Sequence, residues 1–345
     1  MITLKEIAEK CNVSIATVSN ILNGKSNVSE DTKERVLKVI HETGFRPNYM
    51  ARRLRASKTQ SIGIIIDDLT EFSSPQLIDG IMSYLEEHKY KAILENLRFY
   101  SKWGTKWYHN KGYETEVEAA IREFSAIKVD GIIYVAGHAR NISCIPSDLG
   151  IPVVISYAFT NLPGISTVEI DDVQSAYNLA TYLINNGHKK IIALAGTKDN
   201  IHTLRRIEGL KKALADNKIT FDDSQIYYGD WKNDSGYETC KELIETKKDF
   251  SAIFCFNDLM AAGVYDYLND HGISTNDISI VGFDNRTVSQ FLKPALTTME
   301  IPLYEVGRKS AETILNQINS KEDVAKQEYF ITCNLIERKS VKNIK

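Results

Sequence analysis

The chain has 345 residues, of which 43% are hydrophobic and 25% are charged, a composition that suits a globular protein of two or three compact units. No apolar run reaches the roughly 20 residues of a membrane-spanning helix. The N-terminus lacks the pattern of a signal peptide, so we expect a cytoplasmic protein. Five scattered cysteines without a CxxC pair argue against a disulfide scaffold or a structural zinc site.

The net charge of −3 is unevenly distributed along the chain. Residues 1–60 hold 11 basic and 6 acidic side chains, whereas the remaining residues hold 31 and 39. A basic head on an acidic body is typical of a protein that binds nucleic acid. Chance clustering is the alternative, because a difference of this size is modest.

Three short helices are predicted within residues 1–46, an all-α headpiece. Apolar residues recur at helical spacing in each of them. Asn12 tolerates the positive φ that a tight turn needs, and Ser14 can cap the second helix. Asn23 lies where the second helix closes, and Gly44 ends the third. This pattern predicts a helix-turn-helix.

The exposed face of the second helix is small or polar and has no acidic residue, so it can enter a major groove of DNA. Asn suits adenine edges, Ala and Ile suit thymine methyl groups, and the hydroxyl side chains suit phosphate oxygens. The candidate DNA-binding residues here are Ser14, Ile15, Ala16, Thr17, Ser19, Asn20 and Asn23.

Residues 47–59 form a basic linker that is too short to be a stable helix by itself. Met50 and Leu54 lie four residues apart, and arginines that include Arg52 and Arg55 surround them. An apolar side chain beside basic ones is the combination that wedges into a minor groove. We therefore expect a hinge that folds when it binds DNA.

From residue 60 onward, apolar runs alternate with amphipathic helices, which predicts parallel sheets buried on both faces. The predicted strands are 62–66, 91–94, 131–135, 153–155, 190–195, 252–256 and 279–283. The predicted helices are 74–87, 114–126, 172–185, 204–215, 235–246 and 258–270. This α/β pattern predicts two doubly wound lobes with a ligand between them. The body has no phosphate-binding loop, nucleophile elbow or metal-binding motif, so we expect neither an enzyme nor a cofactor.

The head resembles the lactose/galactose repressor (LacI/GalR) family of transcription regulators. The resemblance lies in the runs 3–8, 13–14, 16–19 and 22–24 and in Gly44-Phe45-Arg46-Pro47-Asn48, and it continues into the first strand. It implies that Ile15, Ala16 and Asn20 read bases and that Leu54 is the minor-groove lever. Several relatives carry Arg or His where this chain has Asn20, which puts the operator sequence in doubt.

The resemblance extends over the body and implies a periplasmic-binding-protein-like core with an effector in its cleft. Its motifs include Asn257-Asp258-Leu259-Met260-Ala261 and Ser279-Ile280-Val281-Gly282-Phe283-Asp284. It implies lobes at 60–158 with 286–318 and at 159–285 with 319–340. The implied effector-binding residues are Phe72, Tyr157, Arg206, Trp231, Asn257 and Asp284.

These residues suit a carbohydrate, because Asp and Arg can bind hydroxyl groups and Trp can cover C–H faces. We expect Asp284 and Arg206 to hold hydrogen bonds that only the ligand needs. The structural alternatives are a helix cap for Asp284, a surface charge for Arg206 and a core position for Trp231. Tyr157 stands where some sugar-binding relatives use an acid.

The segment 95–116 is about a dozen residues longer than the family pattern and is rich in aromatic residues. It either walls a pocket, meets a partner or packs on its own lobe. We expect a homodimeric regulator on a palindromic DNA operator that a small molecule switches. Repression is the reading we favour, and activation is the alternative. Residues 341–345 are too few for the tetramerising helix of some relatives. The alternative classes are a periplasmic-type sugar receptor and an enzyme. The headpiece argues against the receptor, and the missing catalytic motifs argue against the enzyme.

Overall fold

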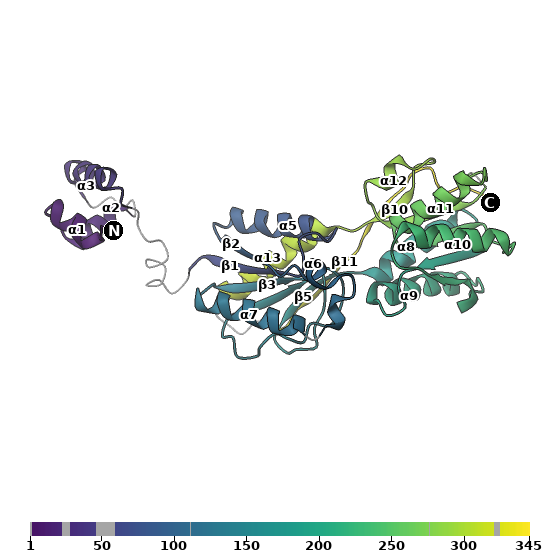
Figure 1. The fold of residues 1–345 in the computed structure, drawn as a ribbon, viewed down its shortest axis with the longest axis horizontal. Helices are drawn as coiled ribbons and strands as arrows, with labels where there is room; N and C mark the ends of the chain where they lie inside the picture. The colour runs from purple at the N-terminus through teal and green to yellow at the C-terminus, as the bar shows by residue number, and fades with distance from the viewer. Residues whose placement is uncertain (1, 23–27, 46–58, 111, 276, 321–324) are drawn as a thin grey trace. The chain divides into compact units, whose positions relative to one another are not determined.

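The structure is a computed structural model that describes residues 2–22, 28–45, 59–110, 112–275, 277–320 and 325–345. The chain forms two compact units, Met1–Thr59 and Gln60–Lys345 (Figure 1). The division between them falls where the sequence predicted the end of the basic linker. No helix in the described part of the chain is long and apolar enough to cross a membrane.

The first unit contains α1 (Leu4–Lys10), α2 (Ile15–Leu22) and α3 (Glu30–Thr43). Thr3 and Glu6 form a capping box at the start of α1. Asn12 makes the predicted turn with φ 49°, the backbone N–H of Thr17 donates to Oγ of Ser14 at 3.0 Å, and Gly44 ends α3 with φ 62°. A small apolar core joins the three helices, made of Ile7, Ala8, Cys11, Val18, Ile21 and Val36.

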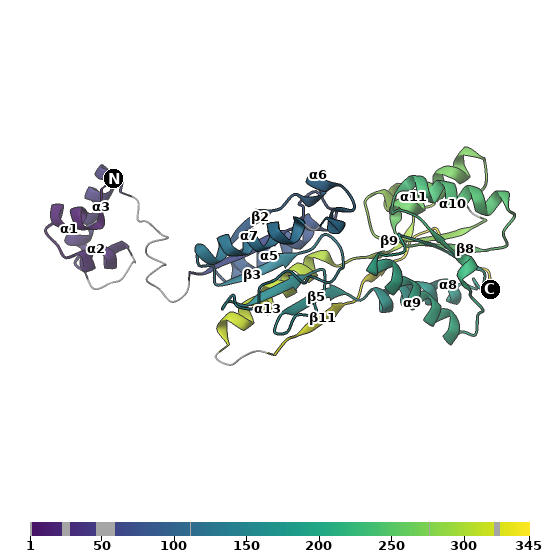
Figure 2. The ribbon, with the colours of Figure 1, turned by 60° about the horizontal axis from the view of Figure 1, so that its bottom comes forward.

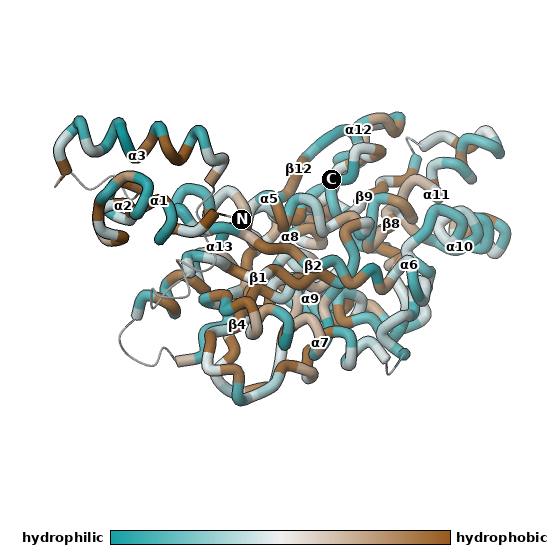
Figure 3. Tube along the Cα trace, turned by 60° about the vertical axis from the view of Figure 1, so that its left-hand side comes forward, coloured by the Kyte–Doolittle hydropathy of each residue, from teal (hydrophilic) through white to brown (hydrophobic). Residues whose placement is uncertain are grey.

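The first lobe of the second unit is built on a parallel sheet in the order β11-β5-β4-β3-β1-β2 (Figure 1). Its elements are β1 (Ser61–Ile66), α5 (Ser74–Glu87), β2 (Lys91–Asn96), α6 (Phe99–Trp103), η1 (Trp107–His109), α7 (Gly112–Ala126), β3 (Gly131–Val135), β4 (Val153–Ser156), β5 (Ser166–Ile170), α13 (Leu303–Asn319) and β11 (Glu328–Ile331). All of β1 is buried, and most of it is brown in Figure 3. Ile64 packs with the apolar side of α5 and α13, whereas Ile65 packs with that of α7. The sheet is therefore covered on both faces.

The second lobe has a sheet in the order β12-β10-β9-β8-β6-β7, parallel except for β12. Its elements are α8 (Asp172–Asn185), β6 (Ile191–Ala195), α9 (Ile201–Asp216), η2 (Asp223–Gln225), β7 (Ile226–Tyr228), α10 (Asn233–Glu245), β8 (Ala252–Cys255), α11 (Asp258–Asp270), β9 (Ser279–Asp284), α12 (Val288–Phe291), β10 (Thr297–Glu300) and β12 (Asn334–Ile336). The prediction of two doubly wound lobes is confirmed.

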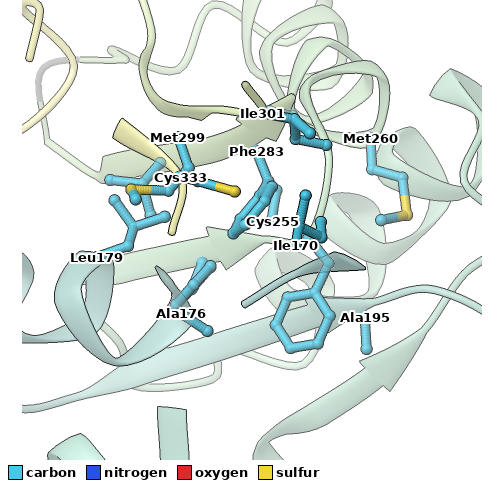
Figure 4. Packing of buried hydrophobic residues seen from close by; sticks show 14 of the residues in the cluster. Ile170, Ala176, Leu179, Ala195, Cys255, Met260, Phe283, Met299, Ile301 and Cys333 are labelled. Atoms are coloured by element: carbon cyan, nitrogen blue, oxygen red, sulfur yellow. The ribbon is translucent and has the colours of Figure 1, made fainter. Parts of the chain in front are cut away.

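The predicted lobe boundaries near residues 158, 285 and 318 are wrong. The chain crosses between lobes after β5 at Asp171, between β10 and α13 at 301–302, and between β11 and β12 at 332–333. The sequence pattern did not predict β5, β10, β11 or β12, the short strands beside these crossings. None of them is a continuous apolar run of the kind that marked β1. Residues at all three crossings are buried in one apolar cluster, as Figure 4 shows for Ile170, Ile301 and Cys333.

Candidate functional site

A cavity of about 580 Å³ lies between the two lobes of the second unit. Loops at the carboxyl ends of the strands supply its lining, with Phe72 after β1, Tyr157 after β4 and Asp284 at the end of β9. Doubly wound sheets place their ligands at this edge, because the strands end there and the loops diverge. Among the described residues, no cluster of His, Cys, Asp or Glu could hold a metal ion. Its position at this edge of both sheets makes the cavity a candidate ligand site.

Each of the six residues predicted to bind an effector lines this cavity: Phe72, Tyr157, Arg206, Trp231, Asn257 and Asp284. They come from both lobes and are separated by up to 212 positions in the sequence. The fold thus brings together the residues that the resemblance singled out. Their contact with a ligand stays a prediction.

Asp284 lies between two arginines at the cavity wall. Its Oδ1 is 3.9 Å from Nη1 of Arg206, and its Oδ2 accepts from Nε of Arg286 at 3.2 Å. Burial raises the pKa of the Asp284 carboxyl, and the two guanidinium groups counter that rise. A carboxylate held in this way keeps lone pairs for the hydroxyl groups of a ligand.

Asp172, at the start of α8, orients the cavity wall from beneath. It is buried, and its two oxygens accept from Nε of Arg206 at 2.8 Å and from Nδ1 of His202 at 2.7 Å. Burial alone would raise the pKa of Asp172, but His202 and Arg206 outweigh it and lower the pKa. Arg206 also donates to the carbonyl of Phe256 and stacks on the ring of Phe283.

The expectation that Arg206 and Asp284 hold hydrogen bonds for the ligand alone is therefore wrong. Both side chains also belong to a buried network that includes Asp172. Removing either one would take one partner from the buried charges that remain, which costs stability as well as ligand contacts.

His202 connects the two lobes. Its Nε2 accepts from the backbone N–H of Ala139 at 3.1 Å, so the neutral ring carries its hydrogen on Nδ1 and donates it to Asp172. Tyr157 follows β4 with φ 66°, and its ring is tilted against that of His202, with the centroids 5.4 Å apart. Burial raises the pKa of the Tyr157 hydroxyl, so it stays protonated.

Trp231 is positioned by its neighbours in the second lobe. Its carbonyl accepts from Nδ2 of Asn257 at 2.8 Å, while Oδ1 of Asn257 caps α11 by accepting from the N–H of Met260. A Cβ at Gly196 would lie 2.0 Å from the indole, so only glycine leaves room for the ring. The polar atoms of Asn257 thus support Trp231 and α11.

The exposed face of α2 is the candidate DNA interface of the first unit. Ser14, Ile15 and Ala16 are exposed, whereas Thr17, Ser19 and Asn20 are half-buried. Val18 and Ile21 turn inward to the small core. The first turn of α2 has no acidic residue to repel phosphate. The remaining candidates lie outside the described residues: Asn23, Met50, Arg52, Leu54 and Arg55.

Comparison with known proteins identifies both units. Residues 3–48 match the family described as "Bacterial regulatory proteins, lacI family", and residues 59–339 match "Periplasmic binding proteins and sugar binding domain of LacI family". The chain belongs to the LacI family of bacterial regulators. Like other LacI-family chains, it combines a DNA-binding headpiece with a ligand-binding core.

Curated relatives of this LacI-family chain cover nearly all or all of its length. It is 32% identical to the catabolite control protein A of Priestia megaterium over 93% of both chains. It is 31% identical to the HTH-type transcriptional repressor PurR of Vibrio atlanticus (strain LGP32) over 100% of both. A crystal structure of the lac repressor dimer bound to operator and the anti-inducer ONPF has the same fold, with a TM-score of 0.80, 22% identity and 99% of both chains covered.

Sequence reasoning missed several residues that line the LacI-family cleft or lie beneath its wall. Asp172 and His202 carry no motif of their own, although Asp172 is the first residue of a predicted helix after a strand. Arg286 lies two residues beyond the motif that ends at Asp284, and Glu71 lies next to Phe72. For Arg286 and Glu71, the signal available in the sequence was their position beside a residue already predicted to bind the effector.

Proposed function

We propose that this LacI-family protein is a transcriptional repressor that acts as a homodimer on a palindromic operator and is switched by a carbohydrate in its interlobe cavity. The observation that supports a carbohydrate is that the ion pair of Asp284 and Arg206 and the indole of Trp231 line the same cavity. Carboxylate and guanidinium groups bind hydroxyl groups, and an aromatic face covers the C–H groups of a sugar ring.

The polar face of α2 supports operator binding, because it offers hydroxyl groups to phosphates and Asn20 to base edges. One such helix buries too little groove for tight, specific binding, and a dimer reads two half-sites. The lac repressor structure that shares this fold is a dimer on its operator, which supports the same assembly here.

Two experiments on the full chain test the proposal. A thermal-unfolding screen against pentoses, hexoses, hexuronates, disaccharides and nucleosides should give a higher unfolding temperature with one or more sugars. A ligand present at about 100 times its Kd adds about 2.7 kcal/mol of stability. A response to nucleosides alone would contradict the carbohydrate assignment.

Selection from random DNA, followed by sedimentation, tests the remaining claims. We expect enrichment of a palindrome, a dimer at micromolar concentration and a change in the affinity for that DNA when the active sugar is added. Enrichment of no sequence, a stable tetramer, or a DNA affinity that the bound sugar leaves unchanged would each overturn the corresponding part.

A further inference from the structure

The aromatic segment, defined as residues 98–110, packs one side of itself into the first lobe. Phe99 and Trp107 are buried, with ring centroids 4.7 Å apart. The ring of Tyr113, at the start of α7, lies 5.4 Å from Trp107. These side chains therefore pack on their own lobe, as one of the three alternatives expected. Other side chains of the segment do not.

A buried ion pair supports the segment from below. Arg140, which follows β3, donates to both carboxylate oxygens of Asp67 at 2.7 and 2.9 Å, and its guanidinium lies 4.4 Å from the ring of Trp107. The backbone N–H groups of Phe99 and Ser101 donate to the carbonyl of Asp67 and to Oδ2 of Asp68, at 2.9 and 3.1 Å. These contacts tie the segment to the ends of β1 and β3.

The opposite side of the segment faces the cavity. Tyr100, Thr105, Lys106 and Tyr108 line it, together with His138 from the loop after β3. Tyr108 is half-buried, with its ring 4.8 Å from that of His138. Burial raises the pKa of Tyr108, and the carboxylate of Asp199 adds to the rise, so its hydroxyl stays protonated. The ring and hydroxyl group are available to a ligand.

The segment also reaches the second lobe. Nε2 of His109 is 3.7 Å from Oδ2 of Asp199, which precedes α9. Figure 2 shows α6 at the end of the first lobe that faces the second. Both partners of this contact are more than half exposed, so we use it for its position and assign it no energy. The segment thus borders the cavity from one lobe to the other.

We propose that the aromatic segment is the selectivity element of this cleft and that Tyr108 contacts the effector directly. The inference rests on the proposed function, because it assumes a carbohydrate in the cavity. Since the segment is anchored to two strand ends, Tyr108 presents a fixed ring to the sugar. A fixed ring favours sugars whose C–H face and hydroxyl groups match it and disfavours those that do not.

Titration calorimetry of the full-length protein tests this with D-ribose, D-glucose, D-glucuronate, maltose and cellobiose as probes. The variants are Tyr108→Ala, Tyr108→Phe and the control Lys102→Ala. Lys102 belongs to the same segment, pairs with Glu116 and is outside the cavity lining. Operator binding without sugar and circular dichroism report whether each variant folds.

We expect Tyr108→Ala to weaken the best-bound sugar by about tenfold and to bring the affinities of the five probes closer together. Tyr108→Phe, which keeps the ring, should stay within about threefold of wild type, and Lys102→Ala should match it. Wild-type affinities in Tyr108→Ala, or an equal loss for all five sugars, would overturn the inference while leaving the carbohydrate assignment in place. Failure of every sugar to bind the wild type would instead remove the proposed function, and this inference with it.

Discussion

The backbone N–H of Ala139 in the first lobe donates to Nε2 of His202 in the second lobe at 3.1 Å. The other ring nitrogen of His202 is 2.7 Å from Asp172, which also orients Arg206. One imidazole therefore joins the contact between the lobes to the buried charges of the ligand cavity. A change in the spacing of the lobes must alter this bond, so the cavity wall and the lobe arrangement are coupled.

Replacement of His202 by Phe should weaken effector binding about two- to tenfold, because one interlobe hydrogen bond is worth about 0.5–1.5 kcal/mol. Calorimetry with a sugar from the thermal screen measures the change. Leu204→Ala is the control, since Leu204 is an exposed residue of the same helix. An unchanged affinity in His202→Phe would mean that the interlobe bond does not favour the ligand-bound arrangement.

Glu71 makes the stability of the protein dependent on pH. Burial, with the charges of Asp67 and Asp68, raises its pKa from 4.5 to about 7. The unfolded state loses this proton near pH 4.5 and the folded state near pH 7, so wild-type stability falls between these values by up to about 3 kcal/mol. Glu71→Gln cannot ionise. In urea unfolding it should match wild type at pH 4.5 and exceed it by about 2–3 kcal/mol at pH 8.

Glu86→Gln, which removes an exposed carboxylate of α5, is the matched control for Glu71. It should track wild type across the same pH range. A constant difference between Glu71→Gln and wild type from pH 4.5 to 8 would show that the titration of Glu71 is not the cause.

Gly196→Ala should displace the indole of Trp231, because the added Cβ would lie 2.0 Å from ring atoms. We expect effector affinity to fall by about tenfold or more, with folding and operator binding retained. The fluorescence spectrum gives a second readout, as the change should disappear when Trp231 is replaced by Phe. A variant with wild-type fluorescence and sugar affinity would remove Trp231 from the site.

Leu54→Ala should lower the ratio of operator affinity to scrambled-DNA affinity by at least about tenfold, which is about 1.4 kcal/mol. The sequence supports this, because an apolar wedge among arginines can unstack a base step. The arginines keep their phosphate attraction, so the salt dependence should change little. Measurements on both DNAs across a salt series check it, with Leu37→Ala, an exposed leucine of α3, as control. Equal losses on both DNAs would contradict a groove contact.

Continuous apolar runs and helical periodicity predicted the central strands and the long helices around them. They failed for β5, where Glu169 is buried in a strand because it pairs with Arg205 at 2.7 Å. The local sequence pattern cannot show that a charged residue is buried when its ion-pair partner lies on a helix distant in the sequence. The resemblance found six residues of the cavity surface but missed others, Arg286 among them. It also missed the buried carboxylate of Asp172, whose role exists only through its contacts with His202 and Arg206.

The three crossings between the lobes also govern how the chain can fold during synthesis. The first lobe needs α13 and β11, and the second needs β10 and β12, so both sheets are completed by elements within residues 297–336. Until residues 328–336 leave the ribosome, each lobe has an unfinished sheet edge exposed to other chains. Truncation before these strands would thus damage both lobes at once. A chain whose synthesis stalls before residue 328 would have neither lobe complete.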